Sequence, residues 1–151
     1  MARFKTRGLD ATIKQMKQLG EMTGEAADKM LVAGASEVKK AWKKAADIHK
    51  LRLTDQMRDS IGYPKKPRDV NGVRTMDIYP QGVSTYTETK KGKRVERKKA
   101  IRNAEIAFIN HYGTSRKPAT HWVDTADDLA EEPTVEAMKA VWDEEMRKRG
   151  L

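Results

Sequence analysis

The sequence predicts an α+β fold in which a small antiparallel sheet with an extended β-hairpin arm packs against a long N-terminal helix and a C-terminal helix. Helical periodicity at both ends of the chain predicts the helices, and turn-rich, Thr-rich segments between them predict the strands. The length of 151 residues is ordinary for one domain, and no linker is visible. We therefore assign 1–151 to a single domain, with an extended basic hairpin arm at about 84–99.

Composition limits the classes of function. Aromatic residues make up only 6% of the chain, so the side chains that dominate core burial are scarce, and we expect partner subunits to help bury the core. The absence of cysteine excludes disulfides, thiolate metal sites and cysteine nucleophiles. No stretch approaches the ~20 apolar residues of a membrane span, and no signal peptide is visible, so we expect a soluble protein that is not exported.

The first part of the chain is expected to be helical. A short amphipathic helix is predicted over 9–19, where apolar residues recur at helical spacing and Gly20 ends the pattern. From Thr23 to Ile48 the same period continues for about seven turns, which predicts one long helix. Small residues at 33–35 would allow another backbone to approach closely.

A second short helix and a strand follow. The segment 53–61 restarts a helix with Thr54 as its N-cap, and Gly62 and Pro64 end it. Alternating side-chain character over 73–79 predicts a half-buried strand.

A polar hairpin is predicted next. Two Thr-rich or charged segments flank the turn Lys90-Lys91-Gly92-Lys93, which is typical of an exposed β-hairpin. Nothing apolar anchors its tip, and an isolated hairpin is marginal in water. Disorder until a partner binds is therefore the alternative.

The last third is expected to contain a strand, a turn and a helix. The apolar run 104–112 is the clearest predicted strand, and Gly113 is expected to supply a positive φ in the turn that follows. A helix is predicted from about Thr120. Pro133 should kink or restart that helix, because proline clashes with the carbonyl four residues before it.

Charge is divided between two segments. From Lys90 to Arg102 there are eight basic residues against one acid, and from Asp124 to Glu145 there are nine acids against one lysine. Such surfaces attract each other within a subunit or between neighbours. The predicted interface residues are Lys90, Lys91, Lys93, Arg94, Arg97 and Lys98 on the basic arm, and Asp124, Asp127, Asp128 and Glu131 on the acidic helix.

Catalytic chemistry is not indicated. The spacing of His49, His111 and His121 fits no compact metal motif, and the hydroxyl side chains lack a matching base. The loop 113–117 lacks the spacing of a P-loop. We expect no enzymatic activity, no metal and no cofactor.

The basic arm has two interpretations. Its charge suits phosphate binding, which would be salt-sensitive and independent of base sequence. Only Tyr86 offers a stacking ring nearby, and no helix-turn-helix or RNA-binding aromatic pair is present. Binding to another protein subunit is therefore favoured, and a nucleic-acid-binding protein that acts through 90–102 is the alternative.

Two motifs point to a family. Thr54-Asp55-Gln56-Met57-Arg58-Asp59-Ser60-Ile61 follows the long helix, and Ile106-Ala107-Phe108-Ile109-Asn110-His111-Tyr112-Gly113-Thr114 precedes Pro118-Ala119-Thr120-His121-Trp122-Val123. In these motifs and their order the chain resembles the tail-completion or head-to-tail joining (neck) proteins of long-tailed bacteriophages. Asp55, His111 and His121 replace the Gly, Glu and Pro of the family pattern, so roles tied to those residues are not carried over.

The resemblance implies a homo-oligomeric ring, commonly of six subunits, that completes the tail and joins it to the head connector, with DNA passing through the lumen. The implied partners are the connector or stopper protein, the tail tube or tail terminator protein, and packaged DNA through non-specific contacts, but no membrane. It also implies a place in the virion after assembly in the host cytoplasm. A tail terminator or connector stopper of the same neck is the alternative. The residues that carry the motifs are Thr54, Ser60, Ile61, Tyr112, Gly113, Thr114, Pro118 and Trp122.

Overall fold

The computed structural model describes residues 24–51, 56–85, 87–96 and 99–148, so the helix predicted over 9–19 lies outside it. The described helices are α2 (Gly24–Ile48), α3 (Gln56–Asp59), α4 (Asn103–Tyr112) and α5 (Trp122–Lys148). The described strands are β1 (Ile61–Gly62), β2 (Arg68–Val70), β3 (Val73–Thr75), β4 (Tyr79–Pro80), β5 (Val83–Ser84), β6 (Thr87–Lys90), β7 (Lys93–Glu96) and β8 (Ile101–Arg102).

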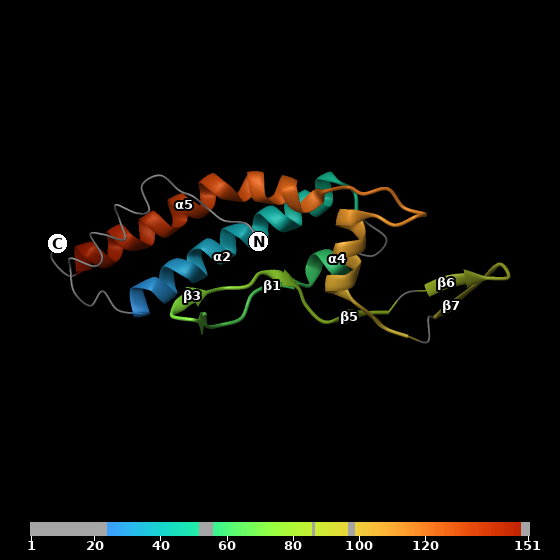
Figure 1. Cartoon of the computed structure of the whole chain (residues 1–151), viewed down its shortest axis with the longest axis horizontal. Helices are drawn as coiled ribbons and strands as arrows, with labels where there is room; N and C mark the ends of the chain where they lie inside the picture. Colours follow the sequence, from blue (N-terminus) through green and yellow to red (C-terminus); the bar gives the residue numbers. More distant parts are fainter. Residues whose placement is uncertain (1–23, 52–55, 86, 97–98, 149–151) are drawn as a thin grey trace.

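Helices α2 and α5 lie side by side along the long axis of the molecule and run in opposite directions (Figure 1). Lys29 near the start of α2 contacts Glu145 near the end of α5. His49, just beyond α2, contacts Thr125 near the start of α5. The two long helices predicted from periodicity are thus confirmed, and they form the body of the molecule. No described helix is long and apolar enough to cross a membrane.

The small-residue face of α2 lets α5 approach closely, as predicted. Gly34 and Ala35 are buried. A Cβ atom at Gly34 would lie 3.1 Å from Met138 Cγ and 3.2 Å from Thr134 Cγ2, both on α5. Any larger side chain at this position would push the helices apart.

The segment 104–112, predicted as the clearest strand, is instead within the helix α4. Its buried residues are Asn103, Ala107 and Asn110, at spacings of four and three, which bring them to one helical face. A short apolar run fits a buried strand or a buried helix, and periodicity does not separate the two. The strand prediction was wrong because it rested on the apolar residues of this segment alone. The spacing of Asn103 and Asn110 fits one face of a helix.

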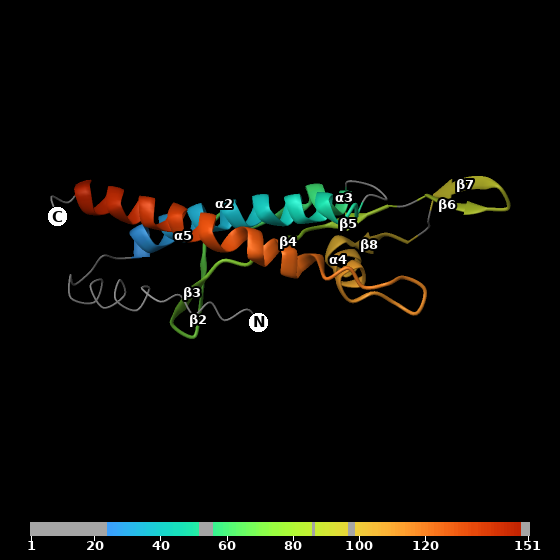
Figure 2. The same ribbon diagram turned by 90° about the horizontal axis from the view of Figure 1, so that it is seen from above.

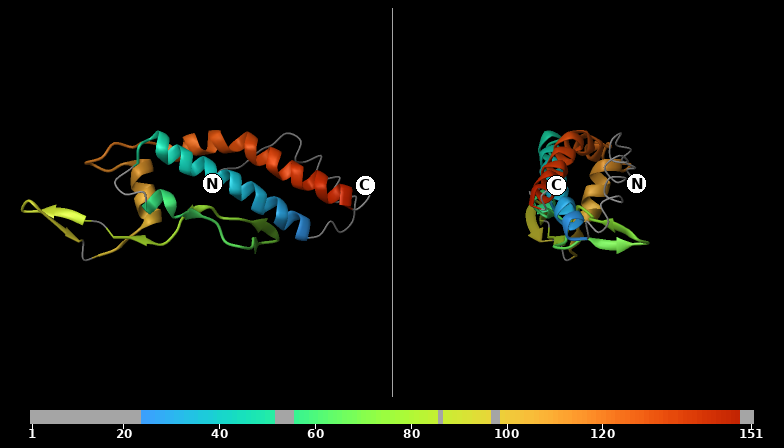
Figure 3. Two further views of the ribbon diagram at one scale, coloured as in Figure 1. Left: turned by 180° about the vertical axis from the view of Figure 1, so that it is seen from behind. Right: turned by 90° about the vertical axis from the view of Figure 1, so that its left-hand side faces the viewer.

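The strands form four separate two-stranded antiparallel sheets: β1–β4, β2–β3, β5–β8 and β6–β7. The strand predicted over 73–79 is divided, because β3 pairs locally with β2 whereas β4 pairs with β1. Figure 3 shows the earlier strands, drawn in green, along one side of the α2–α5 pair and the yellow β6–β7 hairpin beyond its end. The α+β class is confirmed, with several short ribbons in place of one central sheet.

The basic arm contains the predicted hairpin. Strands β6 and β7 pair in antiparallel register, with Lys90 opposite Lys93. Lys91 and Gly92 have φ angles of 50° and 75°, as a type I′ turn requires. Seen from above, the hairpin projects past α4 and away from the helix pair (Figure 2).

Helix α5 continues through Pro133 without restarting. Proline removes one backbone hydrogen bond inside a helix. The buried residues Ala130 and Trp142 lie on either side of Pro133 along α5. Packing on both sides of the proline therefore keeps the helix continuous, which the local sequence did not predict.

The main core lies where α2, α3, β1, α4 and α5 meet. Its buried members are Ala45, Ala46, Met57, Ile61, Ala107, Trp122 and Ala126. Trp42 packs edge-on against Trp122, with ring centroids 5.3 Å apart. Because four of these seven buried residues are alanines, the core is thin, as the composition predicts.

Candidate partner-binding surfaces

The turn at Gly113 joins helix α4 to helix α5, not a strand to a helix. Gly113 has a φ of 75° and a ψ of −176°, a region that essentially only glycine adopts. A Cβ atom there would lie 2.6 Å from the Ala119 backbone nitrogen and 2.7 Å from the Lys117 backbone oxygen. The predicted positive φ is confirmed, and the close backbone approach is a second reason for glycine.

The loop after Gly113 folds back on the end of α4. Thr114 Oγ1 accepts a hydrogen bond from the Lys117 backbone N–H at 3.1 Å. The Thr120 and His121 backbone N–H groups donate to the Asn110 and His111 backbone oxygens, both at 3.1 Å. These hydrogen bonds fix the direction in which the chain enters α5.

Trp122 closes this corner from inside. It is fully buried, and its Nε1–H donates to the Ala107 backbone oxygen at 3.1 Å. Tyr112 and Pro118, from the same motif, are exposed. The motif therefore combines structural residues with residues that face outward.

The first motif is partly described. Ser60 Oγ donates to the Met57 backbone oxygen at 2.7 Å, and Ile61 is 1% exposed in the core. Thr54 lies outside the described residues. At the end of α3, Ser60 therefore caps a backbone carbonyl and Ile61 packs in the core.

The acidic surface lies along the first turns of α5. Asp124, Asp128 and Glu131 are exposed, and Asp127 is half-buried. Burial, together with the neighbouring carboxylates of Asp124 and Asp128, raises the pKa of Asp127 above its ordinary value. This end of α5 is thus a concentrated negative surface.

The basic arm does not contact that surface through any ion pair among the described side chains. Lys91 and Lys93 are exposed at its tip. The side chains of Lys90 and Arg94 are not described, and Arg97 and Lys98 lie outside the described residues altogether. The structure therefore brings the acidic residues together on α5, and among the arm residues with described side chains neither Lys91 nor Lys93 pairs with them.

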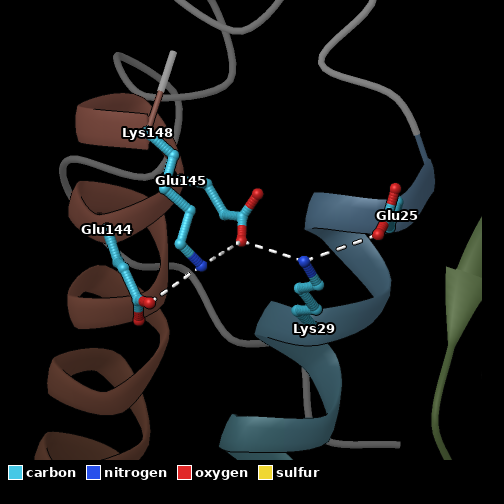
Figure 4. Close-up of polar contacts among 5 residues, drawn as sticks. All are labelled: Glu25, Lys29, Glu144, Glu145 and Lys148. Atoms are coloured by element: carbon cyan, nitrogen blue, oxygen red, sulfur yellow. Dashed lines mark hydrogen bonds and ion pairs between the residues drawn. The ribbon is translucent and has the colours of Figure 1, made fainter. Parts of the chain in front are cut away.

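The opposite end of the helix pair carries a network of ion pairs (Figure 4). Lys29 Nζ lies 3.0 Å from Glu145 Oε1 and 3.5 Å from Glu25 Oε1. Lys148 Nζ lies 2.9 Å from Glu144 Oε1 and 3.5 Å from Glu145 Oε1. The hydrogen bond from Lys29 lowers the pKa of Glu145, whose side chain is 9% exposed.

Two of the three histidines meet at the corner, which their spacing in the sequence did not predict. His111, His121 and Asp124 each offer a ligand atom, and these atoms lie within 4.8 Å of one another. However, His111 Nδ1 accepts a hydrogen bond from the Val123 backbone N–H at 3.3 Å. A neutral imidazole has only one acceptor nitrogen, so a metal would compete with the bond that connects α4 to α5.

An aromatic pocket beside α4 was missed by the sequence reasoning. The pocket has a volume of about 250 Å³ and is lined by Trp42, Tyr79, Pro80, Ala104, Ala107, Phe108, His111, Tyr112, Trp122 and Val123. Phe108 and Tyr112 are more than 60% exposed, and their ring centroids are 4.6 Å apart. The signal was present in the sequence, because residues four apart share one helix face, but it was hidden by the strand interpretation.

Comparison with known proteins identifies the family. Residues 10–96 match the model of the HK97-gp10-like family, described as "Bacteriophage HK97-gp10, putative tail-component". No curated protein and no solved structure matches the chain. The match covers more than half of the 151 residues, and it includes α2, the first motif and the hairpin arm through β7. The chain therefore belongs to the HK97-gp10-like family of bacteriophage tail components.

Proposed function

We propose that this tail component forms a homo-oligomeric ring, most simply a hexamer, at the head–tail junction of the virion. In this role it completes the tail and joins it to the head connector, and DNA passes through the lumen of the ring. The protein acts by binding and not by catalysis. Its partners are further copies of itself, the connector or stopper protein, and the tail tube or tail terminator protein.

The separation of the two charged surfaces supports this proposal. The arm projects from the body (Figure 2), and no described ion pair joins it to the acidic face of its own α5. A ring needs a heterologous interface, in which one patch of each subunit meets a different patch of the next. A basic arm and an acidic helix form such a pair, because they attract each other between subunits.

Particles made without this protein provide the direct test of the function. We expect electron microscopy to show filled heads beside separate, finished tails. Normal joined particles would contradict the proposal. Heads that lose their DNA would instead indicate a connector stopper, and tails of abnormal length would indicate a tail terminator.

Charge reversal tests the role of the arm. We expect replacement of Lys93, Arg94, Arg97 and Lys98 by glutamate to abolish head–tail joining. The matched control reverses four exposed basic residues outside both the arm and the acidic segment 124–145, Lys40, Lys44, Lys50 and Arg147, with the same change in net charge. Joining that survives the arm variant, or that fails equally in the control, would contradict the proposed docking.

The alternative, a nucleic-acid-binding protein, is favoured only by the basic charge of the arm. Light scattering with and without duplex DNA separates the two functions. A monomer or dimer that binds DNA with a steep salt dependence would support the alternative. A protein ring that forms without DNA would support the neck function.

A further inference from the structure

We propose that the tip of the β2–β3 hairpin of one subunit docks into the aromatic pocket beside α4 of a second copy of this chain. The proposal rests on the ring-forming function given above and supplies that ring with a specific contact. It differs from the docking of the basic arm, because it joins two apolar surfaces on other parts of the molecule.

The β2–β3 hairpin ends in an exposed apolar tip. Val70 and Val73 are directly paired across the two strands, so their side chains lie on the same face of the ribbon. They are 41% and 61% exposed. Asn71 and Gly72 between them have φ angles of 53° and 77°, as a type I′ turn requires. The turn therefore presents two adjacent valines to solvent at the end of a narrow projection.

The pocket beside α4 is suited to receive such a tip. The residues that line it are mainly aromatic or aliphatic, and they include the buried Trp122 and Ala107. The exposed rings of Phe108 and Tyr112 also line it. Exposed aromatic side chains around a pocket are typical of protein-binding sites. A volume of about 250 Å³ accommodates two small branched side chains.

The tip and the pocket of one chain lie at opposite ends of α2. Arg74 on β3 pairs with Asp28 in the first turns of α2, whereas Trp42, which lines the pocket, is near the other end of that helix. Asp28 and Trp42 are 14 residues apart in α2, which corresponds to about 21 Å along the helix axis. The hairpin tip of a subunit therefore does not fill the pocket of the same subunit, so a hairpin tip that docks there comes from another copy.

Charge around the two surfaces is complementary. Arg68 and Arg74 beside the hairpin tip already pair with Asp77 and Asp28 of the same chain. The basic charge offered to a partner therefore comes from the exposed Lys65 and Lys66, which precede β2. Glu105, Asp124 and Asp127 lie on α4 and α5 close to residues that line the pocket. Opposite charge at the rim of an apolar contact steers the two surfaces together and sets their register. The basic β6–β7 tip is a poorer occupant, because its turn, Lys90-Lys91-Gly92-Lys93, offers no apolar side chain.

Different patches on the two partners make this contact heterologous. Such contacts repeat from subunit to subunit and close into a ring when the rotation permits. The predicted ring interface then has an apolar contact at its centre and charged residues at its rim, which is the usual arrangement of protein interfaces.

Disulfide trapping tests the contact directly, because the chain has no cysteine of its own. In the double variant Val73→Cys, Phe108→Cys, we expect mild oxidation to produce a ladder of covalent trimers and larger species. Mixing the two single variants should give only covalent dimers. The control double variant Val135→Cys, Phe108→Cys uses another exposed valine, 44% exposed on α5, and should give no ladder.

Association measurements give a second readout. Because Val73 is exposed, Val73→Asp should leave the fold intact by circular dichroism and weaken self-association at least about tenfold, as expected for a central interface residue. Val135→Asp should leave association unchanged.

The outcomes separate this contact from the ring function. An oligomer that gives no Val73–Phe108 ladder, a product that stops at the dimer, or a ladder equal to that of the control overturns the contact while leaving the ring function standing. A protein that stays monomeric at all concentrations also overturns the contact. Electron microscopy of particles made without this protein then tests the head–tail joining function independently.

Discussion

The two ends of the α2–α5 helix pair are held together by different chemistry. At one end, Trp42 and Trp122 pack edge-on, and Trp122 is fully buried. At the other end, Glu145 of α5 forms an ion pair with Lys29 of α2, with Lys29 Nζ 3.0 Å from Glu145 Oε1. The Lys29 side chain is partly exposed. One end is closed by burial of large apolar rings, and the other by charged side chains near the surface.

This difference indicates what each end contributes. Burial of a large apolar side chain stabilises a fold by several kcal/mol, whereas a partly exposed ion pair contributes little and is screened by salt. The aromatic end also carries the α4–α5 corner, the pocket and the acidic surface. We infer that the aromatic end contributes most of the stability and positions the candidate partner-binding surfaces, while the charged end mainly aligns the two helices.

The largest expected effect is at the aromatic end. Trp122→Ala should lower the free energy of unfolding by about 3–5 kcal/mol, because it leaves a cavity in the core. For a chain of this size each kcal/mol corresponds to about 2–4 °C in Tm, which calorimetry can resolve. Trp122→Phe keeps one aromatic ring but loses part of the indole volume and the hydrogen bond to Ala107, so its loss should be smaller. Equal losses in the two variants would contradict a contribution that scales with the buried volume.

A smaller loss is expected at the corner that follows α4. Gly113→Ala should destabilise the protein by about 1–3 kcal/mol, because its backbone conformation is nearly restricted to glycine. A Cβ atom would also meet the backbone at 2.6 Å. Gly92→Ala is the matched control, since Gly92 has the same φ of 75° but a Cβ atom there would have no neighbour within 4 Å. Chemical denaturation of both variants should show the larger loss for Gly113→Ala; the reverse order would refute the close approach.

The smallest effect is expected at the charged end, and it should depend on pH. The Lys29 hydrogen bond lowers the pKa of Glu145 below its ordinary 4.5, so the stabilisation is present above pH 4.5 and is lost as the pH falls through the lowered pKa. Glu145→Gln should therefore be less stable than the wild type at neutral pH, and the difference should narrow below pH 4.5. Thermal unfolding from pH 3 to pH 7 measures this. A constant difference would contradict the ion-pair contribution.

Asp127 at the aromatic end provides a control of opposite sign. Its pKa is raised above the ordinary 3.8 by burial and by neighbouring carboxylates, so its ionisation destabilises the fold as the pH rises through the raised pKa. Asp127→Asn should therefore be slightly more stable than the wild type at neutral pH and should lose this advantage below pH 3.8. The same pH series measures both variants.

Local pattern was sufficient for some elements and misleading for others. The period of α2, the β6–β7 turn and the glycine at 113 follow from backbone geometry that neighbouring residues impose. Helix α4 was not predicted, because a ten-residue segment with mixed apolar and polar character satisfies either a strand or a helix. The pocket depended on α4, so it was missed with it.

The candidate surfaces also differ in whether local sequence or tertiary packing determines them. The acidic residues of α5 could be predicted as one surface, because they are close in sequence and lie on one helix. The meeting of His111 with His121, and of Trp42 with Trp122, joins segments that no local rule connects. Those contacts depend on how α2, α4 and α5 pack.

By itself, the sequence determined the α+β class, the two long helices, the turn residues of the arm and the opposite charges of arm and α5, because these depend on periodicity, backbone preference and composition. Only the tertiary structure decided that 103–112 is helical, that α5 continues through Pro133, and that apolar surfaces lie at both ends of α2. The physical reason is that these features depend on burial against distant segments, whose free energy outweighs the small local preferences of a short stretch of chain.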